Sequence, residues 1–261
     1  MNGQRMYARV SSIETVADKT EAIVMVHGLV VSSRYMIPTA VELAADYCVY
    51  VPDLPGFGKS DKPGHVLSIV ELADTLAAWM DAMGLSKATL LGNSMGCQII
   101  ANFALRHPER IERAILVGPT MDPQARTAHQ EIGRWLINIP GEPLALFPVV
   151  TLDYLQIGFR RFVRTFRHAL QDRIEEHLPL MQIPTLVVGG ARDPVVPLRW
   201  IKEATNLLPK GRFVIIDGAA HDVNFNSPVE LAREVRLFLD ETRDTSTSPQ
   251  PLPPETREPR H

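Results

Sequence analysis

The sequence predicts an α/β fold: a mostly parallel, doubly wound sheet with an inserted helical lid. Short apolar runs alternate with longer helical patterns along most of the 261 residues. The apolar runs are continuous rather than alternating, which is typical of strands buried on both faces of a parallel sheet. One stretch, residues 121–183, breaks this alternation and has a largely helical pattern. These three observations predict one α/β domain that carries an insertion.

The predicted strands are six compact apolar runs. They span residues 22–26, 48–51, 88–91, 114–117, 186–188 and 213–216. Glycine, proline or polar residues follow each run directly. Because the carboxyl ends of parallel strands lie at one edge of an open sheet, we expect the functional residues just after these runs.

Helices are predicted between the strands from the spacing of apolar residues and from their end signals. Residues 69–83 place apolar side chains on one helical face, and Gly84 follows where a helix ends. Near the other end of the chain, Ser227 and Glu230 have the spacing of a capping box, with Pro228 at the tolerated first position. A helix is therefore predicted to begin there.

The insertion at residues 121–183 is interpreted as a helical lid that follows the sixth strand. Three prolines interrupt it: Pro140, Pro143 and Pro148. In its second half, apolar residues share one helical face and four arginines fall mostly elsewhere: Arg160, Arg161, Arg164 and Arg167. The alternative interpretation is a set of extra core helices, and the two are compatible.

The remaining boundaries follow from composition. The core is predicted to comprise residues 1–120 and 184–242, and the Pro-rich tail at 243–261 has almost nothing apolar to bury and is predicted to be disordered. A net charge of −3 gives no electrostatic case for binding nucleic acid or an anionic membrane. No window approaches the ~20 apolar residues of a membrane span. We expect a cytoplasmic protein, with Cys48 and Cys97 as buried thiols.

The strongest motif is Gly92-Asn93-Ser94-Met95-Gly96, which directly follows the strand at 88–91 and opens a helical pattern. A serine hydroxyl is a poor nucleophile unless a base removes its proton, and it meets that base when it projects from a sharp turn at the end of a strand. Small residues two positions before and after relieve the crowding of such a nucleophile elbow. We therefore predict Ser94 as a nucleophile.

The elbow predicts an acid and then a histidine later in the chain. Asp193 follows the strand at 186–188, and His221 follows the strand at 213–216. His221 would accept and return the serine proton, and Asp193 would orient the imidazole, completing a catalytic triad. Asp122, after the strand at 114–117, is the alternative acid. Asp222 is interpreted as a solvated or supporting charge.

Acyl transfer also needs donors for the developing oxyanion. The backbone N–H of Met95 is expected to be one donor of this oxyanion hole. The other is expected from Leu29, with Val30 as the alternative. His27 is interpreted as a structural residue that braces this loop.

Together these segments resemble the alpha/beta-hydrolase superfamily over residues 20–240. The matching pieces are His27-Gly28, Asp53-Leu54-Pro55-Gly56-Phe57-Gly58-Lys59-Ser60, Gly92 to Gly96, His107-Pro108-Glu109-Arg110, Asp193 with Pro197, and Gly218 to His221 followed by Pro228. The resemblance implies a mostly parallel sheet, a cap over the site, and neither a metal nor an organic cofactor.

Within this superfamily, the sequence favours a serine hydrolase acting on a small-molecule carboxylic ester, thioester or lactone through an acyl-serine. Asn93 is similar to the elbow residue of hydrolases that cleave carbon–carbon bonds in ring-fission products. In that interpretation the lid arginines of this chain hold a substrate carboxylate; the alternative is that they form the solvated side of an amphipathic helix. Those enzymes usually have a glycine-rich oxyanion loop, whereas this chain has residues 29–33, Leu-Val-Val-Ser-Ser. Haloalkane dehalogenases and epoxide hydrolases use Asp at the elbow, so Ser94 argues against both. A small-molecule receptor on a hydrolase fold is the alternative from another class.

Overall fold

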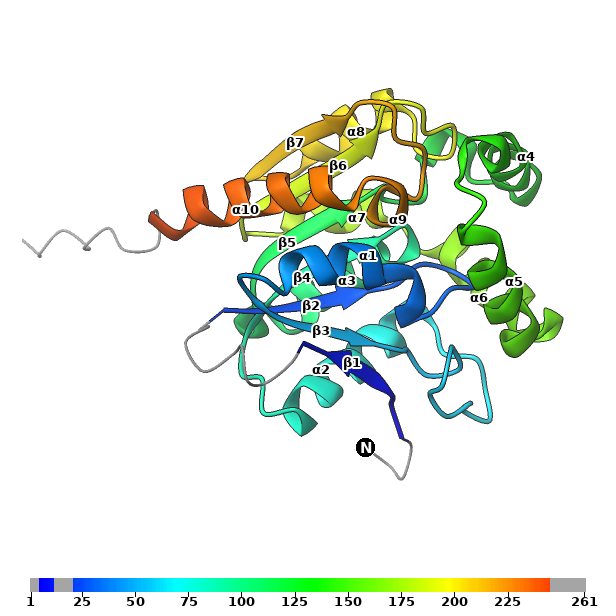
Figure 1. Cartoon of the computed structure of the whole chain (residues 1–261), viewed down its shortest axis with the longest axis horizontal. Coiled ribbons are helices and arrows are strands. Elements are labelled where there is room, and N and C mark those ends of the chain that lie inside the picture. Colours follow the sequence, from blue (N-terminus) through cyan, green and yellow to red (C-terminus); the bar gives the residue numbers. More distant parts are fainter. Residues whose placement is uncertain (1–4, 12–20, 245–261) are drawn as a thin grey trace, which may run out of the picture.

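The computed structural model describes residues 5–11 and 21–244, and shows a central sheet covered by helices on both faces (Figure 1). Seven strands form the sheet in the order β1-β3-β2-β4-β5-β6-β7. All neighbouring pairs are parallel except β1 with β3. This architecture confirms the predicted α/β class.

Six of the strands correspond to the six predicted runs. The strands are β1 (Ala8–Val10), β2 (Ala22–Val26), β3 (Cys48–Pro52), β4 (Ala88–Asn93), β5 (Ile111–Val117), β6 (Thr185–Gly190) and β7 (Gly211–Ile216). Every residue of β4 and β6 is buried, as continuous apolar runs predict. The short edge strand β1 was not predicted, because three partly exposed residues carry no readable hydrophobic pattern.

The helices divide the core into two layers. One layer contains α1 (Ser33–Leu43), α9 (Val223–Asn226) and α10 (Pro228–Asp244), and the other contains α2 (Ile69–Ala82), α3 (Met95–Arg106) and α8 (Leu198–Leu207). Alternate residues of β2 enter the two layers: Val24 and Val26 join the second, whereas Ile23 and Met25 join the first. The two-residue period of a strand thus fills both sides of the sheet.

The predicted end of α2 is confirmed, because Gly84 follows the helix with a φ of +71°. Its start was not predicted from a cap: Ser68 is the N-cap and forms a capping box with Glu71. At the other end of the chain, α10 begins at Pro228 as expected and includes residues 243 and 244, which we had assigned to the tail. The remainder of the predicted tail, 245–261, lies outside the described residues. Both cysteines are buried, Cys48 in β3 and Cys97 in α3.

The helical insertion lies between β5 and β6 in the chain. It therefore follows the fifth strand in chain order and not the sixth. Its helices are α4 (Ala128–Asn138), α5 (Leu146–Ile157), α6 (Phe159–Gln171) and α7 (Ile174–His177). Helices α4, α5 and α6 lie beyond the carboxyl edge of the sheet, whereas α7 packs against α3 (Figure 1). Short 3₁₀ turns occur at Pro108–Arg110, Pro123–Ala125, Ile139–Gly141 and Leu178–Leu180.

Two of the three interrupting prolines lie between α4 and α5, at 140 and 143. The third, Pro148, lies in the first turn of α5, where a helix tolerates a residue without an N–H. None of the helices in the described ranges 5–11 and 21–244 has the length and apolar character needed to cross a membrane.

Candidate active site

Ser94 occupies a tight turn between β4 and α3. Its backbone has φ 55° and ψ −120°, a region that residues with a side chain rarely adopt. A Cβ on Gly96 would lie 2.3 Å from the carbonyl oxygen of Val26, and one on Gly92 would lie 2.7 Å from the carbonyl of Gly96. The two glycines are therefore required by the close approach of β2, β4 and α3 around Ser94.

Asp193 and His221 lie just past the carboxyl ends of β6 and β7. Asp193 Oδ2 is 2.8 Å from His221 Nδ1, and both side chains are buried. The other oxygen, Oδ1, accepts hydrogen bonds from the N–H groups of Val195 at 2.7 Å and Val196 at 2.9 Å. These bonds hold the carboxylate in one orientation, so its free edge faces the imidazole.

The imidazole of His221 is buried, which favours its neutral form. The charge and hydrogen bond of Asp193, with the charges of Asp222 and Glu142, outweigh that effect and raise the pKa of His221 to about 9. The ring also packs on Gly118, where a Cβ would lie 3.1 Å from His221 Cε1. With Nδ1 held by Asp193, Nε2 is the ring nitrogen left for a reacting group.

The alternative acid, Asp122, is engaged elsewhere. Its Oδ2 forms ion pairs with Arg134 at 2.9 Å and Arg199 at 2.6 Å. Burial opposes ionisation of Asp122, but hydrogen bonds from Arg199, the Gln124 N–H and Arg134 hold its pKa below the usual value. The structure therefore places Asp193, and not Asp122, on the imidazole of His221.

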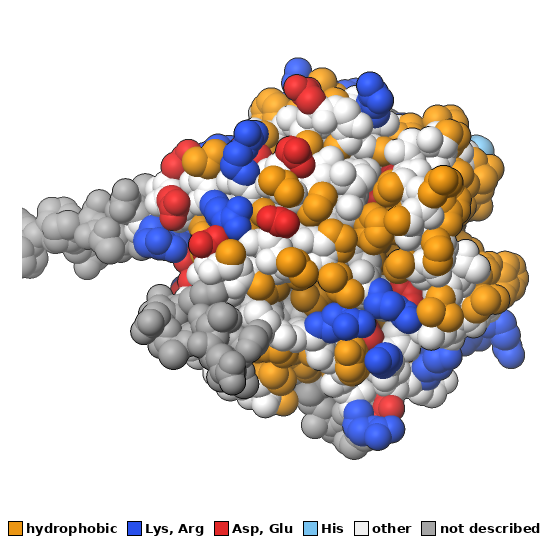
Figure 2. Space-filling model, in the orientation of Figure 1, with side chains coloured by type: hydrophobic (Ala, Val, Ile, Leu, Met, Phe, Trp, Pro, Cys, Tyr) orange, Lys and Arg blue, Asp and Glu red, His pale blue; other side chains and the backbone are white. Residues whose placement is uncertain are grey.

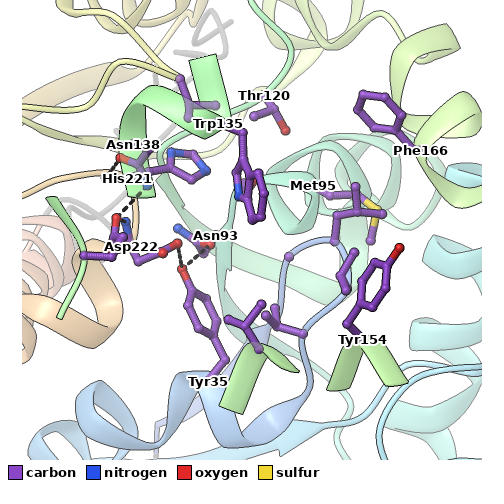
Figure 3. Close-up of a pocket in the computed structure, with 18 of the residues that line it drawn as sticks. Tyr35, Asn93, Met95, Thr120, Trp135, Asn138, Tyr154, Phe166, His221 and Asp222 are labelled. Atoms are coloured by element: carbon purple, nitrogen blue, oxygen red, sulfur yellow. Dashed lines mark hydrogen bonds between the residues drawn. The ribbon is translucent and has the colours of Figure 1, made fainter. Parts of the chain in front are cut away.

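Asp222 is not a simple solvated charge. Its Oδ1 accepts a short hydrogen bond from the hydroxyl of Tyr35, which also contacts Asn93 Oδ1 at 3.0 Å. Burial raises the pKa of Asp222, and the charge of His221 opposes that rise. Asp222 thus belongs to a hydrogen-bonded group that joins α1, the elbow and the His221 loop (Figure 3).

Two residues of the insertion that were not singled out from the sequence contact the His221 loop. Asn138 Oδ1 accepts a hydrogen bond from the backbone N–H of His221 at 3.2 Å, and Asn138 Nδ2 donates to Glu142 Oε1 at 2.7 Å. The same Glu142 oxygen accepts from the Asp222 N–H at 3.2 Å. Burial and the neighbouring charge of Asp222 raise the pKa of Glu142 to about 7. No local sequence signal marks these contacts, because they join segments about eighty residues apart.

The loop after β2 packs against the elbow on the expected oxyanion side. A Cβ on Gly28 would lie 3.3 Å from Ser94 Cβ, and Val30 has a φ of 70°, which is unusual for a β-branched residue. Leu29, Val30 and Met95 all line the same cavity as Ser94. These three residues and Ser94 therefore share one cavity.

His27 links this loop to the loop after β3. Its Nδ1 is 2.9 Å from the carbonyl oxygen of Gly28, and its Nε2 accepts a hydrogen bond from the Leu54 N–H at 3.0 Å. Burial lowers the pKa of His27, so the ring is neutral and Nδ1 carries the proton that it donates to Gly28. Both ring nitrogens are therefore used in holding the loop.

A cavity of about 600 Å³ contains both Ser94 and His221 (Figure 3). Its wall is mostly apolar and draws on α4, α5 and α6 through Ile132, Trp135, Phe147, Tyr154, Phe162 and Phe166. Trp135 lines the cavity and is 50% exposed, so the cavity opens to the surface beside it. Figure 2 shows hydrophobic side chains gathered on the side of the molecule where α4 and α5 lie.

The four arginines of α6 do not line this cavity. Arg161 donates a hydrogen bond to the carbonyl oxygen of Pro63 at 2.9 Å, and Arg160, Arg164 and Arg167 are exposed. Their position corresponds to the solvated face of an amphipathic helix.

The sheet, the strained serine and the buried acid–histidine pair define a hydrolase with an α/β architecture. A family model described as the alpha/beta hydrolase fold matches residues 21–141, and a second, described as a TAP-like protein, matches residues 166–246. The chain belongs to the alpha/beta-hydrolase superfamily.

Three similar proteins illustrate the range of this superfamily. Carboxylesterase YbfK of Bacillus subtilis is 25% identical over 246 residues, covering 84% of this chain and 80% of its own. The 2-hydroxy-6-oxo-6-phenylhexa-2,4-dienoate hydrolase of Burkholderia cepacia is 41% identical over 109 residues, or 40% of this chain and 38% of its own. The structure of a thermophilic esterase from Thermogutta terrifontis superposes with a TM-score of 0.74 at 21% identity, covering 91% of this chain and 94% of that one.

Proposed function

We propose that this hydrolase cleaves a carboxylic ester, or a related thioester or lactone, through an acyl-Ser94 intermediate. The observation that carries the proposal is that the strained Ser94 and His221, which is paired with Asp193, line one largely apolar cavity. An apolar cavity of about 600 Å³ is suited to a small or medium acyl substrate.

In acylation, His221 Nε2 accepts the hydroxyl proton of Ser94 while the serine oxygen attacks the ester carbonyl. Asp193 holds the ring and stabilises the imidazolium that forms. The N–H groups of Met95 and Leu29, or Val30 in place of Leu29, stabilise the negative oxygen of the tetrahedral intermediate. Its collapse breaks the bond to the alcohol oxygen, which takes the proton from His221.

In deacylation, a water molecule replaces the alcohol. His221 accepts a proton from the water as its oxygen attacks the acyl carbonyl, and the same two N–H groups stabilise the second tetrahedral intermediate. Collapse of this intermediate breaks the bond to Ser94 Oγ and returns the proton to it. The products are a carboxylic acid and the regenerated serine.

Residues 121–183 are proposed to act as a lid over this reaction. Helices α4, α5 and α6 supply most of the apolar wall, and exclusion of water by such a wall strengthens the electrostatic interactions around the reacting atoms. The hydrogen bonds of Asn138 and Glu142 to the His221 loop are proposed to hold the lid next to the catalytic histidine.

The test is labelling by a fluorophosphonate probe together with turnover of a series of p-nitrophenyl esters. Wild-type protein is expected to be labelled and to hydrolyse short esters, and Ser94→Ala is expected to lose both while keeping its melting temperature within a few degrees. Labelling that persists at full level in Ser94→Ala would contradict the assignment of the nucleophile.

Carbon–carbon bond hydrolysis of a ring-fission product is the second candidate. Asn93 before the nucleophile and the local 41% identity to the Burkholderia hydrolase favour it, whereas the absence of the α6 arginines from the cavity wall argues against a carboxylate held there. Bleaching of a ring-fission substrate by wild type but not by Ser94→Ala, with no p-nitrophenyl ester hydrolysed, would favour this candidate.

A further inference from the structure

Glu131 is a buried carboxyl group on the wall of the cavity. It lies on α4, is 5% exposed, and lines the same cavity as Ser94 and His221. Its Oε1 has no hydrogen-bond partner among the residues that the structure describes. A buried polar atom without a partner is unfavourable, and in a cavity it indicates that a bound molecule completes the hydrogen bonds.

Thr120, in the segment that follows β5, shows the same property. Its Oγ1 is buried and also lacks a partner within the described ranges, and the residue lines the cavity. Thr120 follows Gly118, which packs on the His221 ring, by two residues. Figure 3 labels both Thr120 and Trp135 among the residues that line the cavity.

The contacts of α4 show which part of the chain Glu131 faces. Glu131, Arg134 and Asn138 have the i, i+3 and i+7 spacing that puts residues on one helical face. Arg134 of this face pairs with Asp122, two residues beyond Thr120, and Asn138 accepts the His221 N–H. Glu131 thus faces the segment that carries Thr120 and the loop that carries His221.

The buried side chains of Tyr35 and Asn138, which also line the cavity, already have hydrogen-bond partners. Tyr35 is hydrogen-bonded to Asn93 and Asp222, and Asn138 to Glu142. Arg134, the arginine of α4, is engaged by Asp122 and by the carbonyl oxygen of Val195 at 3.2 Å. Of the described residues that line the cavity, Glu131 and Thr120 are thus the two with a buried side-chain oxygen that has no partner.

We propose that Glu131 and Thr120 together bind a hydroxyl group of the substrate. A hydroxyl donates one hydrogen bond and accepts others, so it can donate to the Glu131 carboxylate and accept from the Thr120 hydroxyl. An ammonium group has no acceptor and uses Thr120 only as an acceptor. The inference rests on the proposed ester hydrolysis and narrows its substrates to esters with a free hydroxyl in the acyl or the alcohol portion.

The experiment compares matched esters with and without a hydroxyl. Ethyl butyrate is the reference, 2-hydroxyethyl butyrate carries the hydroxyl in the alcohol portion, and ethyl 3-hydroxybutyrate carries it in the acyl portion. The kcat/KM ratio of each hydroxylated ester to the reference is measured in wild type, Glu131→Leu and Thr120→Val. Thr151→Val, at a cavity-lining threonine of α5, is the matched control.

Burial raises the pKa of Glu131 to about 7, so the assays are run at about pH 8, where the carboxyl is mostly ionised. Wild type is then expected to prefer one of the hydroxylated esters by about tenfold or more, since a hydrogen bond to a charged group is worth at least that factor. The preference is expected to disappear in Glu131→Leu, to fall severalfold in Thr120→Val, and to persist in Thr151→Val. Because each ratio is taken within one protein, differences in intrinsic ester reactivity cancel between variants. The favoured ester also shows whether Glu131 and Thr120 bind the acyl or the alcohol portion of the substrate.

Equal ratios in wild type and both variants would overturn the inference, as would a stronger preference for ethyl 3-aminobutyrate than for the hydroxylated esters. If wild type hydrolyses none of these esters, the proposed ester hydrolysis fails, and calorimetric binding of the same esters to Ser94→Ala then decides the inference. In that measurement, tighter binding of a hydroxylated ester that is lost in Ser94→Ala/Glu131→Leu supports it, and equal binding contradicts it.

Discussion

Asn138, the last residue of α4, accepts a hydrogen bond from the backbone N–H of His221, 83 residues further along the chain. The side-chain amide of Asn138 also donates to Glu142, and Glu142 accepts a hydrogen bond from the Asp222 N–H. The insertion between β5 and β6 therefore contacts the loop of the candidate catalytic histidine at two points. The position of His221 is therefore set by the insertion as well as by the sheet.

Asn138→Ala is expected to lower kcat by up to about tenfold with little change in KM, since a hydrogen bond is worth about 0.5–1.5 kcal/mol. Steady-state kinetics on the best p-nitrophenyl ester measure the effect. Asn226→Ala is the matched control, because Asn226 also donates to Glu142 but does not contact the His221 N–H. An equal loss of kcat in both variants would show that the Asn138 bond to His221 has no special role.

Asp193→Asn is expected to lower kcat/KM by about a thousandfold or more, because the imidazole loses the charge that orients it and stabilises its protonated form. Asp122→Asn is expected to retain most activity but to lose about 1–3 kcal/mol of unfolding free energy, since two partly exposed arginines lose their partner. Kinetics and denaturant titration of both variants separate the two roles. The reverse pattern would make Asp122 the catalytic acid.

The pH dependence of kcat/KM is expected to follow the ionisation of His221. The neutral imidazole is the base, and its pKa is raised to about 9, so activity should increase as the pH rises toward 9. Asp222→Asn removes one of the charges that raise this pKa. The rising limb of the kcat/KM profile should therefore move to lower pH. Asp217→Asn, at an exposed residue four positions before His221, serves as the control and should leave the limb in place. An unmoved limb in Asp222→Asn would contradict this electrostatic account.

The backbone of Ser94 is expected to store measurable strain. Glycine adopts its positive φ without penalty, so Ser94→Gly should be more stable than Ser94→Ala by about 1 kcal/mol, although both variants lack the nucleophile. Thermal or denaturant unfolding of the two inactive proteins provides the comparison. Equal stability would indicate that the turn relaxes when the hydroxyl is removed.

Gly96→Ala is expected to destabilise the protein by about 1–3 kcal/mol or to prevent folding, because the new Cβ would meet the Val26 carbonyl oxygen at 2.3 Å. Gly133, in the middle of α4, has open space around it, and Gly133→Ala should instead add about 0.5–1 kcal/mol. The unfolding free energies of the two variants test whether crowding at the elbow explains its small residues. A harmless Gly96→Ala would show that β2 and α3 move apart easily.

Much of the fold and of the candidate site can be predicted from the sequence alone because the signals are local. A buried parallel strand requires a continuous apolar run, and the crowding around Ser94 requires glycines at 92 and 96. The residues that follow such strands then share one edge of the sheet. For this reason Asp193 and His221 were expected to lie together, although they are 28 residues apart in the chain. The edge strand β1 lacked such a signal.

Tertiary structure decided the rest, because those features depend on contacts between distant segments. Asp122 and Asp193 both follow strands, and only the packing of Arg134 and Arg199 against Asp122 leaves Asp193 to pair with His221. The hydrogen bond between Asn138 and His221 and the unpaired Glu131 on the cavity wall likewise arise from how α4 lies across the sheet edge. Helical periodicity predicts that α4 forms, but the free energy of packing many side chains together determines where it rests.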